Sequence, residues 1–107
     1  MKTKPVVPRG IANRDVEEAV DHYLAADAAD AALAFVDALE RSYAQLSRHP
    51  ASGSSRYADP LDLPGLRSWP LKGFPYLIFC FECDDRLDVW RVLHGRRDIP
   101  WWLQDEG

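Results

Sequence analysis

The sequence predicts an α+β fold: a short N-terminal edge strand, then an antiparallel helical hairpin packed on one face of a mainly antiparallel sheet with a three-stranded C-terminal meander. Two observations support this prediction. Apolar residues recur at helical spacing between about residues 13 and 49, and three extended apolar runs follow between residues 66 and 93. At 107 residues, the chain is expected to form one domain, residues 1–107, around a single core.

The first two elements are a strand and a helix. Residues 5–8 form a short apolar run with a proline at each end, and because proline has no N–H this strand is expected at a sheet edge. Asn13 is the expected N-cap of the helix. Its apolar positions are Val16, Ala19, Val20, Tyr23 and Leu24. Its first turns contain acidic residues that suit the helix dipole: Asp15, Glu17, Glu18 and Asp21.

A second helix is expected after Asp27 and up to about His49, where Pro50 and Gly53 end it. Its apolar side consists of Leu33, Phe35, Val36, Leu39, Tyr43 and Leu46. The join at residues 26–28 is so short that the two helices must fold back on each other as an antiparallel hairpin.

Residues 52–65 are rich in turn-forming residues and predict a loop across the surface. Three strands follow, at residues 66–71, 76–83 and 87–93, and a short polar connection joins the last two. In the central strand both faces are apolar, with Leu77, Phe79 and Phe81 on one and Tyr76, Ile78 and Cys80 on the other. One of these faces is therefore expected to pack on the helical hairpin.

The composition excludes several classes of function. No apolar run approaches the ~20 residues of a membrane span, so no membrane partner is expected. The N-terminus lacks the apolar stretch of a secretory signal, which predicts a cytoplasmic location. The net charge of −4 opposes a broad basic surface, so direct nucleic-acid binding is not expected as the main mode of action.

Cys80 and Cys83 form the sequence CFEC, a spacing that also occurs in zinc and redox sites. Zinc needs further ligands, and the three histidines show no ligand spacing: His22, His49 and His94. Residues three apart on a strand point to opposite faces, so we favour two unlinked thiols. No metal and no cofactor are expected.

The charge is distributed unevenly along the chain. Residues 1–63 hold seven Lys or Arg against ten Asp or Glu, whereas residues 66–97 hold six against four. The predicted sheet is therefore mildly basic on an acidic scaffold. This asymmetry suits an acidic protein partner at least as well as a nucleic acid.

Arg91 opens the stretch RVLHGRRD, which ends the last strand. A regular strand would place it on one face with Leu87, Val89 and Leu93. A charge among apolar neighbours either lines a cleft or reaches a carboxylate such as Glu82 or Asp88 across or along the meander. Arg91 is the best single candidate for a functional residue.

Other candidates lie on or after the strands. His94 either acts as an acid or base, or hydrogen-bonds a turn that Gly95 is expected to permit, with Arg96 and Arg97 beyond it. Arg67 and Lys72 either contact a ligand or line a solvated strand edge. Trp101 and Trp102 either dock a C-terminal turn onto the domain or anchor a partner.

Three stretches of the chain resemble a known family: LRS at residues 66–68, FPYLIF at residues 74–79 and RVLHGRRD at residues 91–98. Together with the order of the elements, they resemble the toxins of the RelE/ParE superfamily of bacterial type II toxin-antitoxin modules, most closely the ParE branch. The resemblance covers about residues 6–104.

This resemblance implies a small growth-inhibiting toxin that a cognate antitoxin neutralises. ParE-like members poison DNA gyrase without being enzymes, and we expect this chain to do the same. The alternative is a ribosome-dependent endoribonuclease of the RelE type, for which the catalytic candidates are Arg67, Lys72, Arg91 and His94. A further alternative is a non-toxic homologue that only binds antitoxin. The acidic net charge and the absence of a C-terminal tyrosine after the last strand weigh against the nuclease.

The expected antitoxin site is the apolar surface left by the helical hairpin and the sheet edge. A segment of the antitoxin would add there as a helix or as a strand.

Overall fold

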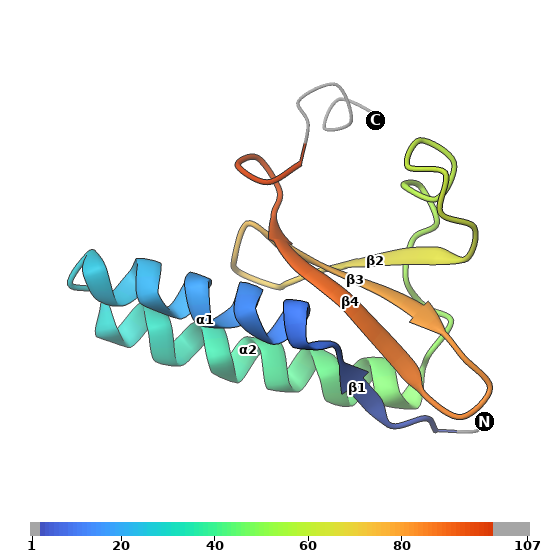
Figure 1. Ribbon diagram of the computed structural model, residues 1–107. Coiled ribbons are helices and arrows are strands. Elements are labelled where there is room, and N and C mark those ends of the chain that lie inside the picture. Colours follow the sequence, from blue (N-terminus) through green and yellow to red (C-terminus); the bar gives the residue numbers. More distant parts are fainter. Residues whose placement is uncertain (1–2, 100–107) are drawn as a thin grey trace.

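The computed structural model describes residues 3–99 and has the predicted α+β architecture. Its elements are β1 (Val6–Pro8), α1 (Gly10–Ala25), α2 (Ala29–Arg48), β2 (Leu66–Pro70), β3 (Tyr76–Glu82) and β4 (Leu87–His94). The two helices lie side by side against one face of the sheet (Figure 1). No helix in the described part of the chain is long and apolar enough to cross a membrane.

The sheet has the strand order β1-β4-β3-β2. β1 pairs in parallel with β4, and the other two pairings are antiparallel, so the predicted C-terminal meander is confirmed. β1 is at the edge, as its prolines predicted. The N–H of Leu87 donates to the carbonyl of Pro5 at 2.8 Å, and the N–H of Arg9 donates to the carbonyl of Val89 at 2.9 Å. The chain then turns directly into α1.

The start of α1 differs from the prediction. The helix begins at Gly10 with Arg9 at the N-cap position, and Asn13 lies inside it, donating its N–H to the carbonyl of Arg9 at 3.0 Å. No acidic residue lies in the first turn. Asp15 lies further along the helix and is buried, so its role is not to complement the helix dipole in solvent.

The hairpin itself is as predicted, but two of its leucines are not in the core. Leu24 is 52% exposed and Leu33 is 71% exposed. Both lie near the tip of the hairpin, which extends past the sheet (Figure 1), so that no strand among the described residues covers them there. Asp27, in the tight link, has a φ of 58°, the left-handed conformation that closes the connection.

Apolar side chains bury both faces of the sheet. The larger cluster lies between the sheet and the helices, and its buried members include Phe35, Leu39, Leu46, Tyr76, Ile78, Cys80, Val89 and Val92. The second cluster, on the opposite face, is formed by Tyr57, Leu66, Phe79 and Ile99. The face assignments predicted for β3 are therefore confirmed. The loop at residues 52–65 supplies Tyr57, whose ring centroid is 5.4 Å from that of Phe79, so this loop covers the second face.

A bulge interrupts β4. Cys80 pairs with Val89 and Phe79 pairs with Arg91, which leaves Trp90 as an extra residue. The extra residue shifts the alternation of faces: Leu87 and Val89 belong to the cluster on the helices, whereas Leu93 packs on the opposite cluster. The prediction that these three residues and Arg91 share one face is wrong for this reason.

Candidate functional site

Arg91 is held by Asp15 of α1. Its Nε donates to Asp15 Oδ2 at 2.8 Å and a terminal nitrogen donates to Oδ1 at 2.9 Å, while the backbone N–H of Val92 donates to Oδ2 at 3.0 Å. The hydrogen bonding of Arg91 to Asp15 raises the pKa of Arg91 against the opposing effect of burial. The Asp15 side chain is 8% exposed and that of Arg91 is 29% exposed. The carboxylate therefore ties the first helix to both the side chain and the backbone of β4.

The carboxylates expected to pair with Arg91 have other partners. Asp88 accepts hydrogen bonds from Nε and a terminal nitrogen of Arg9 at 2.6–3.1 Å. Glu82 accepts one from Lys4 at 2.9 Å. The expected pairing across or along the meander is wrong because Lys4 and Arg9, which flank β1, bind these two carboxylates, and Asp15 of α1 binds Arg91 instead.

His94 closes the turn after β4. Its Nδ1 accepts the backbone N–H groups of Arg96 and Arg97 at 3.1 and 3.0 Å, and its own N–H donates to Asp98 Oδ2 at 2.8 Å. Its ring centroid lies 5.2 Å from that of Tyr76. The alternative in which His94 hydrogen-bonds a turn is therefore confirmed, and the ring nitrogen that a proton would occupy is already used as an acceptor.

Acid is expected to weaken this turn. Burial, followed by the charge of Arg97, lowers the pKa of His94 from its ordinary value of 6.5. Because the pKa of His94 is lower in the folded protein than in the unfolded chain, the folded protein is most stable where His94 is neutral, above the pKa of the unfolded chain. The free energy of unfolding then decreases as the pH drops through 6.5 toward the pKa of His94 in the folded protein. The free energy of unfolding, measured with denaturant, should therefore decrease as the pH is lowered from about 7.5 to about 5.

The matched variants are His94→Gln and His49→Gln. His49 is exposed, so its removal should leave the pH dependence intact, whereas His94→Gln should flatten it. Equal slopes in the two variants would show that the His94 turn is not the acid-sensitive element.

Arg96 and Arg97 follow in the same turn. A terminal nitrogen of Arg97 donates to the hydroxyl of Tyr76 at 3.1 Å, and its Nε lies 3.8 Å from Asp98 Oδ1. Gly95 does not need glycine's freedom, contrary to expectation, because its φ is not positive and an added Cβ would lie 3.6 Å from the carbonyl oxygen of Pro75, an ordinary contact. Trp101 and Trp102 lie outside the described residues.

The other two candidates lie elsewhere on the molecule. Arg67 donates to the backbone carbonyls of Ala51 and Gly53, both at 3.1 Å, and so holds the segment that follows α2. Lys72 is exposed in the turn between β2 and β3, where Gly73 adopts a φ of +85°. Arg67 and Lys72 therefore lie apart from the turn that contains His94, Arg96 and Arg97, and the structure does not bring all the cationic candidates together around one reacting group.

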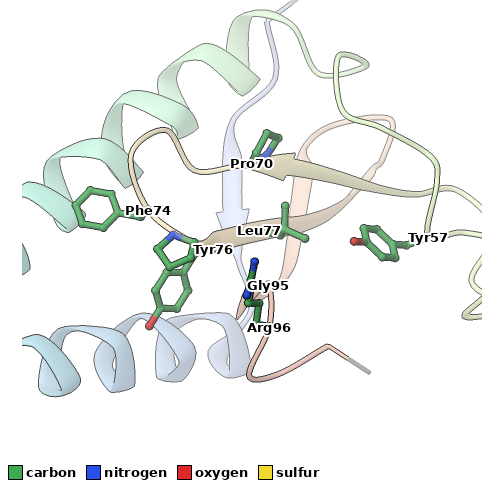
Figure 2. Close-up of a pocket in the computed structure, with 8 residues that line it drawn as sticks. Tyr57, Pro70, Phe74, Tyr76, Leu77, Gly95 and Arg96 are labelled. Atoms are coloured by element: carbon green, nitrogen blue, oxygen red, sulfur yellow. The ribbon is translucent and has the colours of Figure 1, made fainter. Parts of the chain in front are cut away.

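A pocket of about 530 Å³ lies beside this turn, and we call it the turn pocket. It is lined by Tyr57, Pro70, Phe74, Pro75, Tyr76, Leu77, Gly95 and Arg96. Phe74 and Tyr57 stand on opposite sides of it, with Leu77, Gly95 and Arg96 between them (Figure 2). The pocket thus combines aromatic and proline walls with one guanidinium group, a lining suited to an apolar side chain beside a polar contact.

A second depression, the α2 pocket, has a volume of about 380 Å³. It is lined by Ala34, Ala38, Arg41, Ser42, Gln45, Lys72 and Phe74. Phe74 lines both pockets, so the two pockets meet at this residue. A smaller polar cleft of about 230 Å³ lies between α1 and the turn after β4, where Glu18, His22 and Arg97 line it.

The free edge of β2 offers little to an added strand. The N–H of Leu66 donates to the carbonyl of Leu63 at 3.1 Å, and Ser68 exchanges two hydrogen bonds of 2.8 Å with Ser54. Pro70 has no N–H to donate. The loop that covers the second face therefore also occupies this edge.

Beyond β1, the outer edge of β4 is closed in a different way. The N–H groups of Val92 and His94 donate to the carboxylates of Asp15 and Asp98. A segment that paired with β4 here would have to displace both carboxylates. Strand addition at β2, or at β4 beyond β1, would thus compete with existing hydrogen bonds.

The cysteines play no part in these sites. Cys80 and Cys83 are free thiols, and burial raises the pKa of Cys80 to about 11, which keeps it protonated near neutral pH. Within residues 3–99 no group of three or more potential metal ligands comes together.

Sequence reasoning missed Asp15, Asp98 and Phe74. A signal for Asp15 was present, because it occupies the helical stripe of Ala12 and Ala19, both buried, and an acid on a buried stripe requires a partner. Nothing comparable marked Phe74, since its importance comes from its place between two pockets.

Comparisons with known proteins agree with this fold. Residues 7–99 match the family described as "ParE toxin of type II toxin-antitoxin system, parDE". A solved structure described as "Chromosomal ParDE TA system from P. aeruginosa" superimposes with a TM-score of 0.72 at 18% sequence identity, over 86% of this chain and 96% of that one. At this identity the superposition shows the fold alone. No curated protein matches the sequence significantly.

Proposed function

Since this chain belongs to the ParE toxin family of type II toxin-antitoxin systems, we propose that it acts by binding: an antitoxin neutralises it, and DNA gyrase is its target. The observation that carries the binding mode is that its cationic candidates do not converge. Arg91 is held by Asp15, Arg67 by backbone carbonyls, and Nδ1 of His94 by a turn. The proposed target would place its action in the cytoplasm.

The nuclease alternative requires side chains that share one phosphate. Cleavage needs a group to take up a proton and cations to stabilise the charge that develops on the phosphate, all within hydrogen-bond reach of it. Here the Nδ1 of His94 accepts two backbone N–H groups, and Lys72 lines a pocket on α2 rather than the turn. This arrangement supports a binding protein over an RNA-cleaving one.

The target is tested with purified protein in two parallel reactions, one with gyrase and supercoiled plasmid and the other with translating ribosomes. We expect linear, cleaved DNA to accumulate while the message stays intact, because a gyrase poison traps the cleaved-DNA state. Cuts at defined codon positions with no linear DNA would overturn the gyrase proposal and favour ribosome-dependent cleavage.

Expression of the gene alone and with its neighbour tests toxicity and neutralisation together. The expected result is a growth defect that disappears on co-expression, with a complex of the two products recovered. A complex without any growth defect from the isolated gene would point instead to a non-toxic antitoxin-binding homologue.

A further inference from the structure

We propose that an acidic segment of the antitoxin docks across Phe74, with one bulky apolar side chain in the turn pocket and another in the α2 pocket. This inference rests on the proposed function, because it names the surface and the chemistry by which the antitoxin would be recognised. Three features carry it: the lining residue that the two pockets share, the charge of their lining, and the hydrogen bonds that already occupy β2 and the part of β4 beyond β1.

Phe74 is the ridge between the two pockets, and the core fixes it from beneath. Its ring centroid lies 5.5 Å from that of Phe35 and 5.9 Å from that of Tyr23, in edge-to-face contacts. Phe74 is half-buried and is a lining residue of both pockets. A rigid aromatic ridge between two depressions is suited to a segment with two apolar anchors, and such anchors dominate binding at protein interfaces.

The charge of the lining is opposite to that of the whole molecule. The chain carries 17 Asp and Glu against 13 Lys and Arg. The described residues that line the two pockets nevertheless include three cations, Arg41, Lys72 and Arg96, and no carboxylate. The positive charge lies in both parts of this lining, with Arg96 in the turn pocket and Lys72 in the α2 pocket, where Arg41 also pairs with Asp37. Acidic residues beside the apolar anchors would complement this lining.

The same geometry favours side-chain docking over strand addition. The outward N–H groups of Leu66, Ser68, Val92 and His94 already have acceptors within the chain. A segment lying over the α2 stripe of Ala34 and Ala38 displaces none of these hydrogen bonds, and the two small side chains allow close approach. The surface fits a helix or a short extended segment seated by its side chains.

A nucleic acid would be a poor fit to this surface. Phosphate backbones are bound mainly by arrays of Lys and Arg that release counterions, whereas half of the residues that line these two pockets are alanine, proline or aromatic. The net charge of −4 adds long-range repulsion.

The test measures the dissociation constant and association rate of the antitoxin, used as the purified product of the neighbouring gene. The variants are Lys72→Glu and Arg96→Glu at the two ends of the surface, and Ala34→Trp, which fills the α2 pocket from an exposed position. The control is Arg86→Glu in the hairpin between β3 and β4, where Arg86 is exposed and pairs with Asp85. Thermal unfolding checks that each variant is folded.

We expect each of Lys72→Glu and Arg96→Glu to raise the dissociation constant about tenfold at low salt, chiefly through slower association, and Ala34→Trp to raise it at least as much. Arg86→Glu should stay within about twofold of the unaltered chain. Normal binding by the three folded variants would overturn this inference and leave the proposed function intact. Absence of any complex with the unaltered chain would overturn both.

A binding assay with duplex DNA completes the design. If Lys72→Glu and Arg96→Glu abolished DNA binding by the chain and left antitoxin binding unchanged, the surface would be a nucleic-acid site and the peptide proposal would be wrong.

Discussion

Replacing Asp15 with alanine is expected to lower the free energy of unfolding by about 3 kcal/mol, because removing this buried carboxylate leaves the half-buried guanidinium of Arg91 uncompensated. The carboxylate accepts two hydrogen bonds from Arg91 and one from the backbone of Val92. All three donors would lose their acceptor at once. Chemical denaturation of the purified variant at neutral pH measures the loss.

The control for this prediction is Glu17→Ala, which removes an exposed acid from the same helix and should change stability by less than about 0.5 kcal/mol. A double-mutant cycle with Arg91→Ala should give a coupling energy between the two residues of about 1–3 kcal/mol. A loss below about 1 kcal/mol for Asp15→Ala would contradict the structural role given to the pair.

Toxicity assays of Arg91 variants have to be interpreted with this pair in mind. If Arg91→Ala abolishes growth inhibition, we expect the cause to be the loss of the contact with Asp15. In that case Asp15→Ala should show the same defect. A variant of Arg91 that stays as stable as the unaltered chain but is inactive would point to direct contact with the target.

Phe35→Ala is expected to cost about 3–5 kcal/mol, the range for a fully buried phenylalanine whose removal leaves a cavity. Phe35 is 0% exposed, and its ring contacts those of Tyr23, Phe74 and Tyr76 with centroid separations of 6.0, 5.5 and 5.1 Å. The same side chain therefore supports both the core and the ridge between the pockets. Denaturation of Phe35→Ala and of the exposed control Leu33→Ala should separate the two positions clearly.

A milder change separates folding from binding. Phe35→Leu keeps most of the apolar volume and should cost about 1–1.5 kcal/mol, so the protein stays folded. The smaller side chain no longer supports the rings of Phe74 and Tyr76 from below, so antitoxin affinity should fall although the fold persists. Unchanged affinity in folded Phe35→Leu would show that the position of these rings does not govern binding.

Local patterns were enough to predict the architecture. The two faces of β3 follow from strict alternation along an extended strand, and the edge position of β1 follows from prolines that cannot donate to a ladder. The hairpin follows from helical periodicity interrupted by a three-residue link. Each of these properties depends only on residues that are close together in the sequence, so it can be predicted from the sequence alone.

Predictions that needed an exact register were less successful. One extra residue in β4, Trp90, moved Leu93 to the face opposite Leu87 and Val89. Alternation cannot reveal a bulge of this kind, because Trp90 and its neighbours are compatible with either face. The error then affected Arg91, whose surroundings depend on the strand beyond the bulge.

The sequence by itself therefore determined the α+β class, the element order and the markers of the ParE family, since these depend on periodicity and on short motifs. Only the tertiary structure decided what the charged residues do. Arg91 and Asp15 are 76 residues apart in the chain, and they meet because β1 ends at Pro8 and lets α1 lie along the open edge of β4. The surface at Phe74 has the same origin: the packing of the turn between β2 and β3 against α2 places two pockets that share this residue, and no local pattern records which distant residues will line them.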